Sequence, residues 1–315
     1  MYNLMVQRQL GADTVVEVGF MGNRGSGLLI NPNINDAYPA PPTDTSSPQS
    51  RRIVSTRLGN LPYISPQGFS NYNALIVSLE KRYSRGISLL ANYTWSRAFG
   101  VAPPLNAGIN AVPVLNVLDL KRHYGPLEFD IQQRAVFSYV YDLPFGKGKR
   151  YLGQTSRALN HVLGGWQFGG ITTFQGAFPI TPVLGVSLGR TFTNSRPNAV
   201  GDPAQSSRQP HDWINRNAFA IPSGADVAAG NYFGNTGTGS VRAPGLVNFD
   251  FSILKNIAVR ENIRGQFRTE FFNLTNTPFF GLPGAVNTIF GSALFGRVTA
   301  AGDPRVVQFG MKLIF

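Results

Sequence analysis

The sequence predicts an all-β fold, a transmembrane antiparallel β-barrel segment of about nine strands. Apolar and polar residues alternate with a period of two in nine separate stretches, as expected for strands with one apolar face. Short connections and long ones rich in Gly, Pro and Asn follow each other in turn, as in barrels with short periplasmic turns and long external loops. Of the 315 residues, 43% are apolar and only 14% are charged. No apolar run is long enough for a membrane helix, so a membrane location requires a sheet.

The first half of the chain contains two expected hairpins. Strands are expected at 2–10 and 14–21, joined by the short turn Gly11, Ala12 and Asp13. Residues 22–70 lose the alternation and are expected to form a long irregular loop. The second hairpin is expected around the turn Ser84, Arg85 and Gly86, with strands over about 75–82 and 87–96.

The second half repeats the scheme. After a loop at about 98–128, strands are expected at about 135–142 and 166–175, with a longer turn at 143–150. The largest loop, 177–245, holds much of the Pro and Gly and precedes a fourth hairpin, 247–253 and 263–271, with its turn near Arg260, Glu261 and Asn262. The last strand runs to Phe315, and its apolar residues alternate with Gln308, Gly310 and Lys312.

The strand count sets an expectation about completeness. The last strand follows a long loop, so Phe315 is expected at the periplasmic rim and Met1 at the external rim. Complete single-chain bacterial barrels have an even number of strands, and the sequence opens without an export signal. We therefore expect residues 1–315 to be a single segment, the carboxy-terminal part of a larger barrel.

Composition and motifs argue against several functions. Cysteine is absent, which excludes disulfides and thiol chemistry. The net charge of +12 comes from scattered bases rather than a patch, so acidic lipid headgroups and lipopolysaccharide are expected partners and nucleic acid is not. The three histidines, His123, His161 and His211, have no second ligand at i+3 or i+4.

Two glycine-rich stretches also lack the context that catalysis needs. Gly146-Lys147-Gly148-Lys149 does not have the phosphate-loop spacing, and Gly22–Gly27 is not followed by a helix or by His and Asp partners in order. We expect no enzyme activity, no metal and no cofactor.

Two groups of residues are candidate functional sites. Asp250, Arg264, Arg268 and Glu270 share the polar face of the fourth hairpin and are expected to form a charged network on the lumen wall. In the largest loop, four aromatic residues are candidates for gripping a ligand: Trp213, Phe219, Tyr232 and Phe233. A loop that only protects the barrel explains the same residues equally well.

Several motifs together resemble the barrel of TonB-dependent receptors of the Oar-like kind. They are Asn71-Tyr72-Asn73-Ala74-Leu75, Leu79-Glu80-Lys81-Arg82, Tyr93-Thr94-Trp95-Ser96, Leu143-Pro144-Phe145-Gly146-Lys147-Gly148, Gly164-Gly165-Trp166-Gln167, the run from Phe267 to Asn276, and Phe295-Gly296-Arg297. The chain end resembles outer-membrane barrels as well, because Gln308, Gly310, Leu313 and Phe315 match the pattern that the barrel-assembly machinery recognises.

The resemblance implies a plugged transporter of the 22-stranded class in the outer membrane of a Gram-negative cell envelope. Its parent function would be energised uptake of a bulky nutrient of the siderophore, oligosaccharide or peptide class. This chain has no plug domain and no TonB-contacting segment, so its expected partners are the missing plug and amino-terminal strands, and it would meet TonB only through the missing part.

A soluble, secreted β-rich binding module is the alternative, because a β-sandwich shows the same alternation. Its outer faces would normally carry Lys and Glu. Here the polar positions are mostly Asn, Gln, Ser and Thr, which suits a water-filled lumen and favours the barrel.

Overall fold

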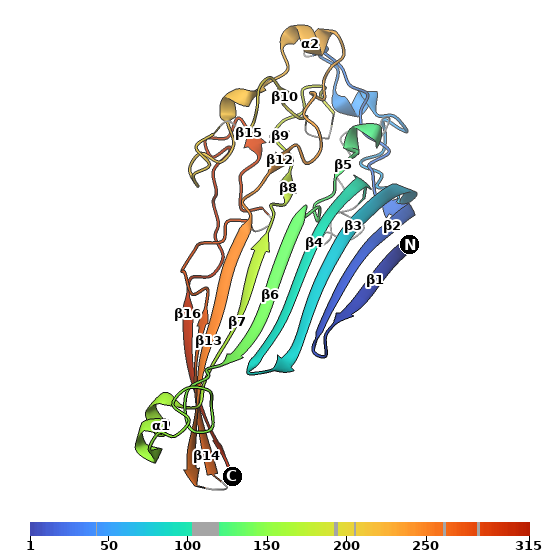
Figure 1. The fold of residues 1–315 in the computed structure, drawn as a ribbon. Helices are drawn as coiled ribbons and strands as arrows, with labels where there is room; N and C mark the ends of the chain where they lie inside the picture. The colour runs from blue at the N-terminus through green and yellow to red at the C-terminus, as the bar shows by residue number, and fades with distance from the viewer. Residues whose placement is uncertain (42, 103–119, 192–194, 205, 261–262, 282–283) are drawn as a thin grey trace.

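A computed structural model of the chain describes residues 1–41, 43–102, 120–191, 195–204, 206–260, 263–281 and 284–315. Its main feature is one antiparallel sheet in which neighbours in sequence are neighbours in space (Figure 1). The long strands of this sheet, in order, are β1 (Tyr2–Leu10), β2 (Thr14–Ile30), β3 (Ser65–Ser84), β4 (Ile87–Val101), β6 (Gln133–Asp142), β7 (Trp166–Gln175), β13 (Leu246–Arg260), β14 (Ile263–Phe272) and β16 (Val306–Ile314). The expected nine strands and their order are confirmed.

Shorter elements lie in the connections, and β5 (Gly125–Pro126) adds to the sheet by pairing with β4. The others are η1 (Pro48–Arg51), η2 (Leu120–His123), α1 (Arg157–Leu163), β8 (Pro179–Ile180), β9 (Val183–Leu184), β10 (Asn198–Ala199), η3 (Arg216–Ala218), β11 (Phe219–Ala220), α2 (Gly224–Ala228), β12 (Val241–Arg242) and β15 (Ile289–Phe290). None of the helices in the described ranges is long and apolar enough to cross a bilayer.

The register between strands gives the sheet two chemically different faces. Residues directly opposite each other on neighbouring strands point to the same face. One such row crosses seven strands and is apolar: Val6, Val18, Val77, Tyr93, Ala135, Phe174 and Val247. The next row points to the other face and is mostly polar: Gln7, Glu17, Ser78, Asn92, Val136, Thr173 and Asn248. A continuous apolar face of this width matches the lipid-facing band of a membrane barrel.

The structure corrects the expected loop at 22–70. β2 continues to Ile30 and β3 begins at Ser65, so both ends of this stretch, 22–30 and 65–70, are strand. The register shifts between Ser26 and Leu28, and again between Leu28 and Ile30. Gly27 lies at the first shift with φ of 67°, a backbone conformation that glycine adopts without strain. These irregularities break the period-two pattern, which explains why the sequence predicts a loop there.

The connection between β6 and β7 is also longer than the expected turn at 143–150. It runs over residues 143–165 and contains α1 at its carboxy-terminal end. Ser156 caps α1, because its side chain accepts a hydrogen bond from the Leu159 backbone N–H at 3.3 Å. Elsewhere, β4 extends to Val101, beyond the expected loop start at Ala98, and the turn at Glu261 and Asn262 lies outside the described residues.

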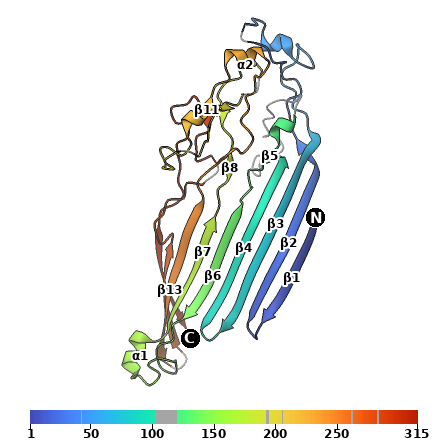
Figure 2. The same ribbon diagram turned by 45° about the horizontal axis from the view of Figure 1, so that its top comes forward.

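The sheet is curved and open (Figure 2). β1 pairs only with β2 and β16 only with β14 in the described part of the chain, so these two strands are the edges. The long connections gather at one end of the strands, and the hairpin turns, α1 and the carboxy-terminus lie at the other (Figure 1). This arrangement confirms the expected separation into a rim of long external loops and a rim of periplasmic turns.

Candidate functional site

The external loops fold together into a packed assembly above the sheet. β12 pairs with β8, β11 with β10, and β15 with β9, and the last pair joins two different loops. The loops also share a small apolar core, formed by Ile214, Ala218, Phe219, Val241, Ala243, Val286 and Phe295. Loop 31–64 joins the same assembly, because the Ala40 backbone N–H donates to the Gly189 carbonyl at 3.0 Å. The external surface is therefore preorganised.

This core changes the interpretation of the four aromatic ligand candidates. Phe219 and Phe233 are only 5% and 6% exposed, so both are packed inside the assembly and are not available to a ligand at its surface. Trp213 is half-buried, and its indole Nε1 donates to the Arg242 carbonyl at 2.9 Å. Tyr232 is half-buried as well. The sequence shows aromatic residues among polar ones, but it does not show that two of them face inward.

An ion pair joins the loops to the sheet. Asp130, just before β6, is 1% exposed, and its Oδ2 lies 2.5 Å from Arg242 Nη2 on β12. Its other oxygen, Oδ1, accepts from the Ala98 backbone N–H at 2.6 Å. Arg242 Nη1 also donates to the backbone carbonyls of Asp130 at 2.6 Å and Ala177 at 3.3 Å. A carboxylate this deeply buried needs such partners, so the pair fixes β12 against β4, β6 and β7.

A second buried arginine holds the upper part of the assembly. Arg196 is 6% exposed, and its guanidinium donates to the carbonyls of Arg122 and Thr236 and to the Thr238 hydroxyl at 3.0 to 3.3 Å. Burial, with a smaller contribution from the nearby Arg122 charge, lowers the pKa of Arg196 to about 10. The group remains charged at neutral pH and connects three separate stretches of loop.

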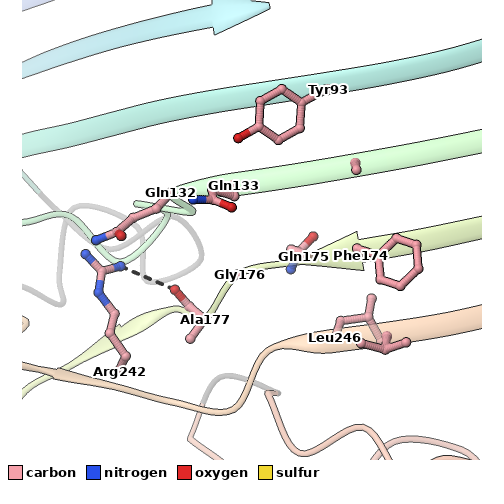
Figure 3. A pocket seen from close by; sticks show the side chains of 11 residues that line it. Tyr93, Gln132, Gln133, Phe174, Gln175, Gly176, Ala177, Arg242 and Leu246 are labelled. Carbon is pink, nitrogen blue, oxygen red and sulfur yellow. Dashed lines mark hydrogen bonds between the residues drawn. The ribbon is translucent and has the colours of Figure 1, made fainter. Parts of the chain in front are cut away.

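A groove of about 410 Å³ opens where the loops meet the sheet (Figure 3). Tyr93, Ala135, Phe174 and Val247 line it from the apolar row of the sheet. Its other lining residues are Gln132, Gln133, Gln175, Gly176, Ala177, Arg242 and Leu246. Because the strand residues belong to the apolar face, the groove opens on the lipid side of the sheet rather than on the lumen.

The chemistry of the groove suits an apolar chain more than a charged solute. Arg242 is its only charged lining residue, and its guanidinium is already engaged by Asp130. The Gln132 amide oxygen, in the orientation that satisfies both neighbours, accepts from Arg242 Nη2 at 2.8 Å and Arg97 Nη1 at 2.5 Å. The remaining lining is mostly apolar, with the amide side chains of Gln132, Gln133 and Gln175. This arrangement fits the end of a lipid acyl chain.

The four predicted lumen residues share one face but do not form one network. Arg268 Nε and Glu270 Oε2 are 3.4 Å apart, and both side chains are partly exposed. Asp250 instead accepts a hydrogen bond from the Asn273 backbone N–H at 2.9 Å. Arg264 lies opposite Ala258 and Ile314, six residues along β14 from Glu270, or roughly 20 Å away at the usual rise of a strand. The structure thus brings together one pair of the four.

The carboxy-terminal residues occupy an edge strand. On β16, Gln308 lies opposite Glu270, Gly310 opposite Arg268, and Leu313 opposite Gly265. β16 ends at Ile314, and Phe315 follows it with 91% of its surface exposed. The alternation predicted for this strand is confirmed, whereas recognition by the assembly machinery stays a prediction.

Lys255 breaks the apolar face and is not among the residues predicted from the sequence. It lies opposite Trp166 and Phe267 on that face, yet it is only 6% exposed. Its Nζ donates to the Val162 carbonyl at 3.0 Å and to the Gly164 carbonyl, both at the end of α1, and lies 4.8 Å from the centre of the Trp166 ring. A lysine within an otherwise apolar alternation was the available signal. In the described part of the chain, no three His, Asp or Glu side chains are grouped as metal ligands would be.

The alternating sheet, its continuous apolar face and its separate rims define a membrane β-barrel protein. A family model described as an outer membrane beta barrel domain matches residues 1–308, and the chain belongs to this family. It is therefore a protein of the outer membrane. No curated protein matches the chain.

The fold of the chain is similar to part of the fold of solved outer-membrane proteins. The outer membrane transporter YddB from Escherichia coli matches over 99% of this chain and 32% of its own, with a TM-score of 0.52 and 8% identity. The siderophore receptor PiuA from Acinetobacter baumannii matches with a TM-score of 0.44 and 8% identity, over 97% of this chain and 26% of its own. FpvA of P. aeruginosa, solved bound to heterologous pyoverdines, has a TM-score of 0.45 and 8% identity, over 99% of this chain and 26% of its own. The chain thus spans about a third of the length of YddB and about a quarter of the length of PiuA and of FpvA.

Proposed function

We propose that this chain is the carboxy-terminal part of the barrel of a TonB-dependent receptor, Oar-like in its motifs, whose parent function is energised uptake of a bulky nutrient. The observation that carries the proposal is that the whole nine-stranded sheet matches about a third of an outer membrane transporter. The substrate class, siderophore, oligosaccharide or peptide, follows from the family resemblance. We expect no catalysis from this chain.

In this proposal the external assembly is where the nutrient first binds. Its loops are joined by a shared core and by the buried Arg196 and Asp130 side chains, so its surface has a defined shape. A preorganised surface loses less conformational entropy on binding than mobile loops do. The soluble, secreted alternative is not supported, because the continuous apolar face of the sheet would be left in water.

The experiment is to isolate the outer-membrane polypeptide that carries these residues. A short affinity tag inserted at Gly237, an exposed loop position with open space around it, permits purification from detergent-extracted outer membranes. We expect an intact mass well above 34.2 kDa and binding of the purified periplasmic domain of TonB. A porin from the same membrane with the same tag is the control. A heat-modifiable barrel of 34.2 kDa that does not bind TonB would refute the proposal.

A further inference from the structure

The connection between β6 and β7, residues 143–165, exposes apolar side chains and turns a polar one inward. Its helix α1 has an apolar stripe at positions i, i+3 and i+4, formed by Leu159, Val162 and Leu163. A surface helix of a soluble protein turns such a stripe toward the core. Here the three side chains are 46%, 64% and 38% exposed. The polar Asn160 instead points into the connection, where its Oδ1 accepts from the Lys147 backbone N–H at 2.6 Å.

The position of α1 places this stripe next to lipid. The carbonyl of Val162 accepts hydrogen bonds from Lys255 Nζ at 3.0 Å and from Trp166 Nε1 at 2.8 Å. Both side chains belong to the apolar face of the sheet, so the end of α1 lies on that face. α1 also lies at the rim of the hairpin turns, opposite the long loops (Figure 1). It therefore sits where the apolar band of the barrel meets the periplasmic water.

The charge of the connection completes the pattern. Residues 143–165 contain four bases and no acid. The four bases, all exposed, are Lys147, Lys149, Arg150 and Arg157. Of these four bases, only Lys149 lies within ion-pair distance of Asp142, the residue before the connection, at 3.9 Å. Exposed aromatic and apolar residues, Phe145, Tyr151 and Leu152, lie among these bases. Basic residues beside an exposed apolar surface are typical of segments that lie in the interface of an anionic membrane.

We propose that residues 143–165 are an interfacial anchor for the periplasmic leaflet. In this anchor Leu159, Val162 and Leu163 enter the acyl-chain region, and the basic side chains bind the phosphates of anionic phospholipids. Lys255 and Trp166, on the strands, hold the anchor to the barrel by donating hydrogen bonds to backbone carbonyls at the end of α1. The partner is the lipid surface itself, because the stripe and the bases together match a leaflet with apolar chains and negative headgroups.

The absence of cysteine makes the test direct, because a single introduced cysteine can carry a fluorescent label. The full chain with Val162→Cys is labelled and reconstituted into nanodiscs of phosphatidylcholine alone or mixed with phosphatidylglycerol. The matched control is Gly237→Cys in the external loops, and circular dichroism confirms that each variant keeps its β structure. Quenching by a water-soluble quencher and by a lipid carrying a quencher in its acyl chain is then compared.

We expect the Val162 label to be quenched several-fold more by the lipid quencher than the Gly237 label, and more strongly when phosphatidylglycerol is present. Lys147→Gln with Arg157→Gln is expected to remove the dependence on phosphatidylglycerol. Arg57→Gln with Arg208→Gln, which removes the same charge from exposed loop positions, is expected to keep it. A Val162 label as open to water as Gly237 would overturn the proposal. A label shielded from both quenchers would also overturn it, because it would show that Val162 contacts protein. Quenching by the lipid quencher that does not change with phosphatidylglycerol would overturn it as well.

Discussion

Lys255 is a charged residue on the apolar face that is stabilised by α1, a helix far from it in the sequence. A lysine facing lipid costs about 2–4 kcal/mol at the membrane midplane and less near the interface. Lys255 avoids this cost because it lies near the rim and donates to two carbonyls at the end of α1. Helix carboxy-termini carry partial negative charge, so the ammonium and the helix end stabilise each other.

Lys255→Met is expected to lower the free energy of unfolding by about 1–3 kcal/mol, because the α1 carbonyls lose a charged donor in a buried place. Urea unfolding of the chain in bilayers measures the change. Lys312→Met is the control, since Lys312 is an exposed residue on the polar face, and it should be nearly neutral. Equal effects of the two substitutions would contradict the role given to α1.

Arg242→Met tests the joint between the loops and the sheet. It leaves Asp130 buried without its counter-charge, which typically costs about 3–5 kcal/mol when a buried pair is broken. Because the barrel itself is not touched, we expect faster proteolysis of the external loops in intact cells with heat-modifiability unchanged. Arg208→Met, at an exposed loop position, should leave proteolysis as it was. Unchanged cleavage in both variants would show that the pair does not hold the loops.

The site residues were only partly predictable from the sequence, for a physical reason. The alternation assigns Arg268 and Glu270 to one face, and the structure pairs them. It does not say how far apart Asp250 and Arg264 lie on that face, because this depends on strand length and register. Phe219 is buried in a core formed by loops distant in sequence, and Phe233 lies against Arg122 of another loop, which no local pattern records.

At the scale of the element, each strand has a lipid side and a lumen side. Phe249 and Phe267 lie on the apolar face, and Gln266 lies on the polar one. Phe249→Arg is expected to cost about 2–4 kcal/mol, because it places a charge in hydrocarbon, and Phe267→Arg, opposite Lys255 and nearer the rim, is expected to cost less. Gln266→Arg, which faces the lumen, should be mild. Equilibrium unfolding in bilayers gives the three values, and equal tolerance would remove the assignment of the faces.

The terminal strand carries a prediction about assembly. Deleting Phe315, or making Phe315→Asp, is expected to leave expression intact but to hold the protein in the periplasm, because the chain end is the predicted recognition signal for the assembly machinery. Phe315 is almost fully exposed, so little folded structure depends on it. Fractionation with a heat-modifiability assay follows the outcome. A normal outer-membrane barrel after the deletion would contradict the prediction.

Elements were predictable where the pattern is regular. Period two located all nine long strands, since each has one face in lipid. It failed for residues 22–30 and 65–70, where bulges change the register between β2 and β3. It also gave no sign of α1, because seven residues make only two helical turns and their apolar stripe is too short to separate from strand alternation.

For the whole molecule, the two edges of the sheet decide what the chain does alone. β1 and β16 run in the same direction, because the path from β1 to β16 across the sheet crosses an even number of antiparallel pairings. They can close directly only as parallel neighbours, and open edges in hydrocarbon leave backbone groups unpaired at a cost of several kcal/mol each. We expect no energised uptake by these 315 residues alone.

Reconstitution in liposomes measures this. Uptake of ferric siderophore, maltooligosaccharide and oligopeptide probes is compared between liposomes with the chain and empty ones, in the presence of an energised TonB complex. We expect no difference. TonB-dependent import of any of these probes by this chain would refute the proposal that it needs further strands and a plug to transport.

The lengths of β2, β3 and β4 have a consequence at the cell surface. They contain 17, 20 and 15 residues, whereas a tilted strand crosses the bilayer with about 9–11. Their hairpin turns lie together at the periplasmic rim, so the excess projects outward, by roughly 20 Å for β3 at the usual rise and tilt. An antibody or bacteriophage reaching the cell would contact this projecting protein wall before the lipid surface. A solute would diffuse down along the wall to reach the membrane.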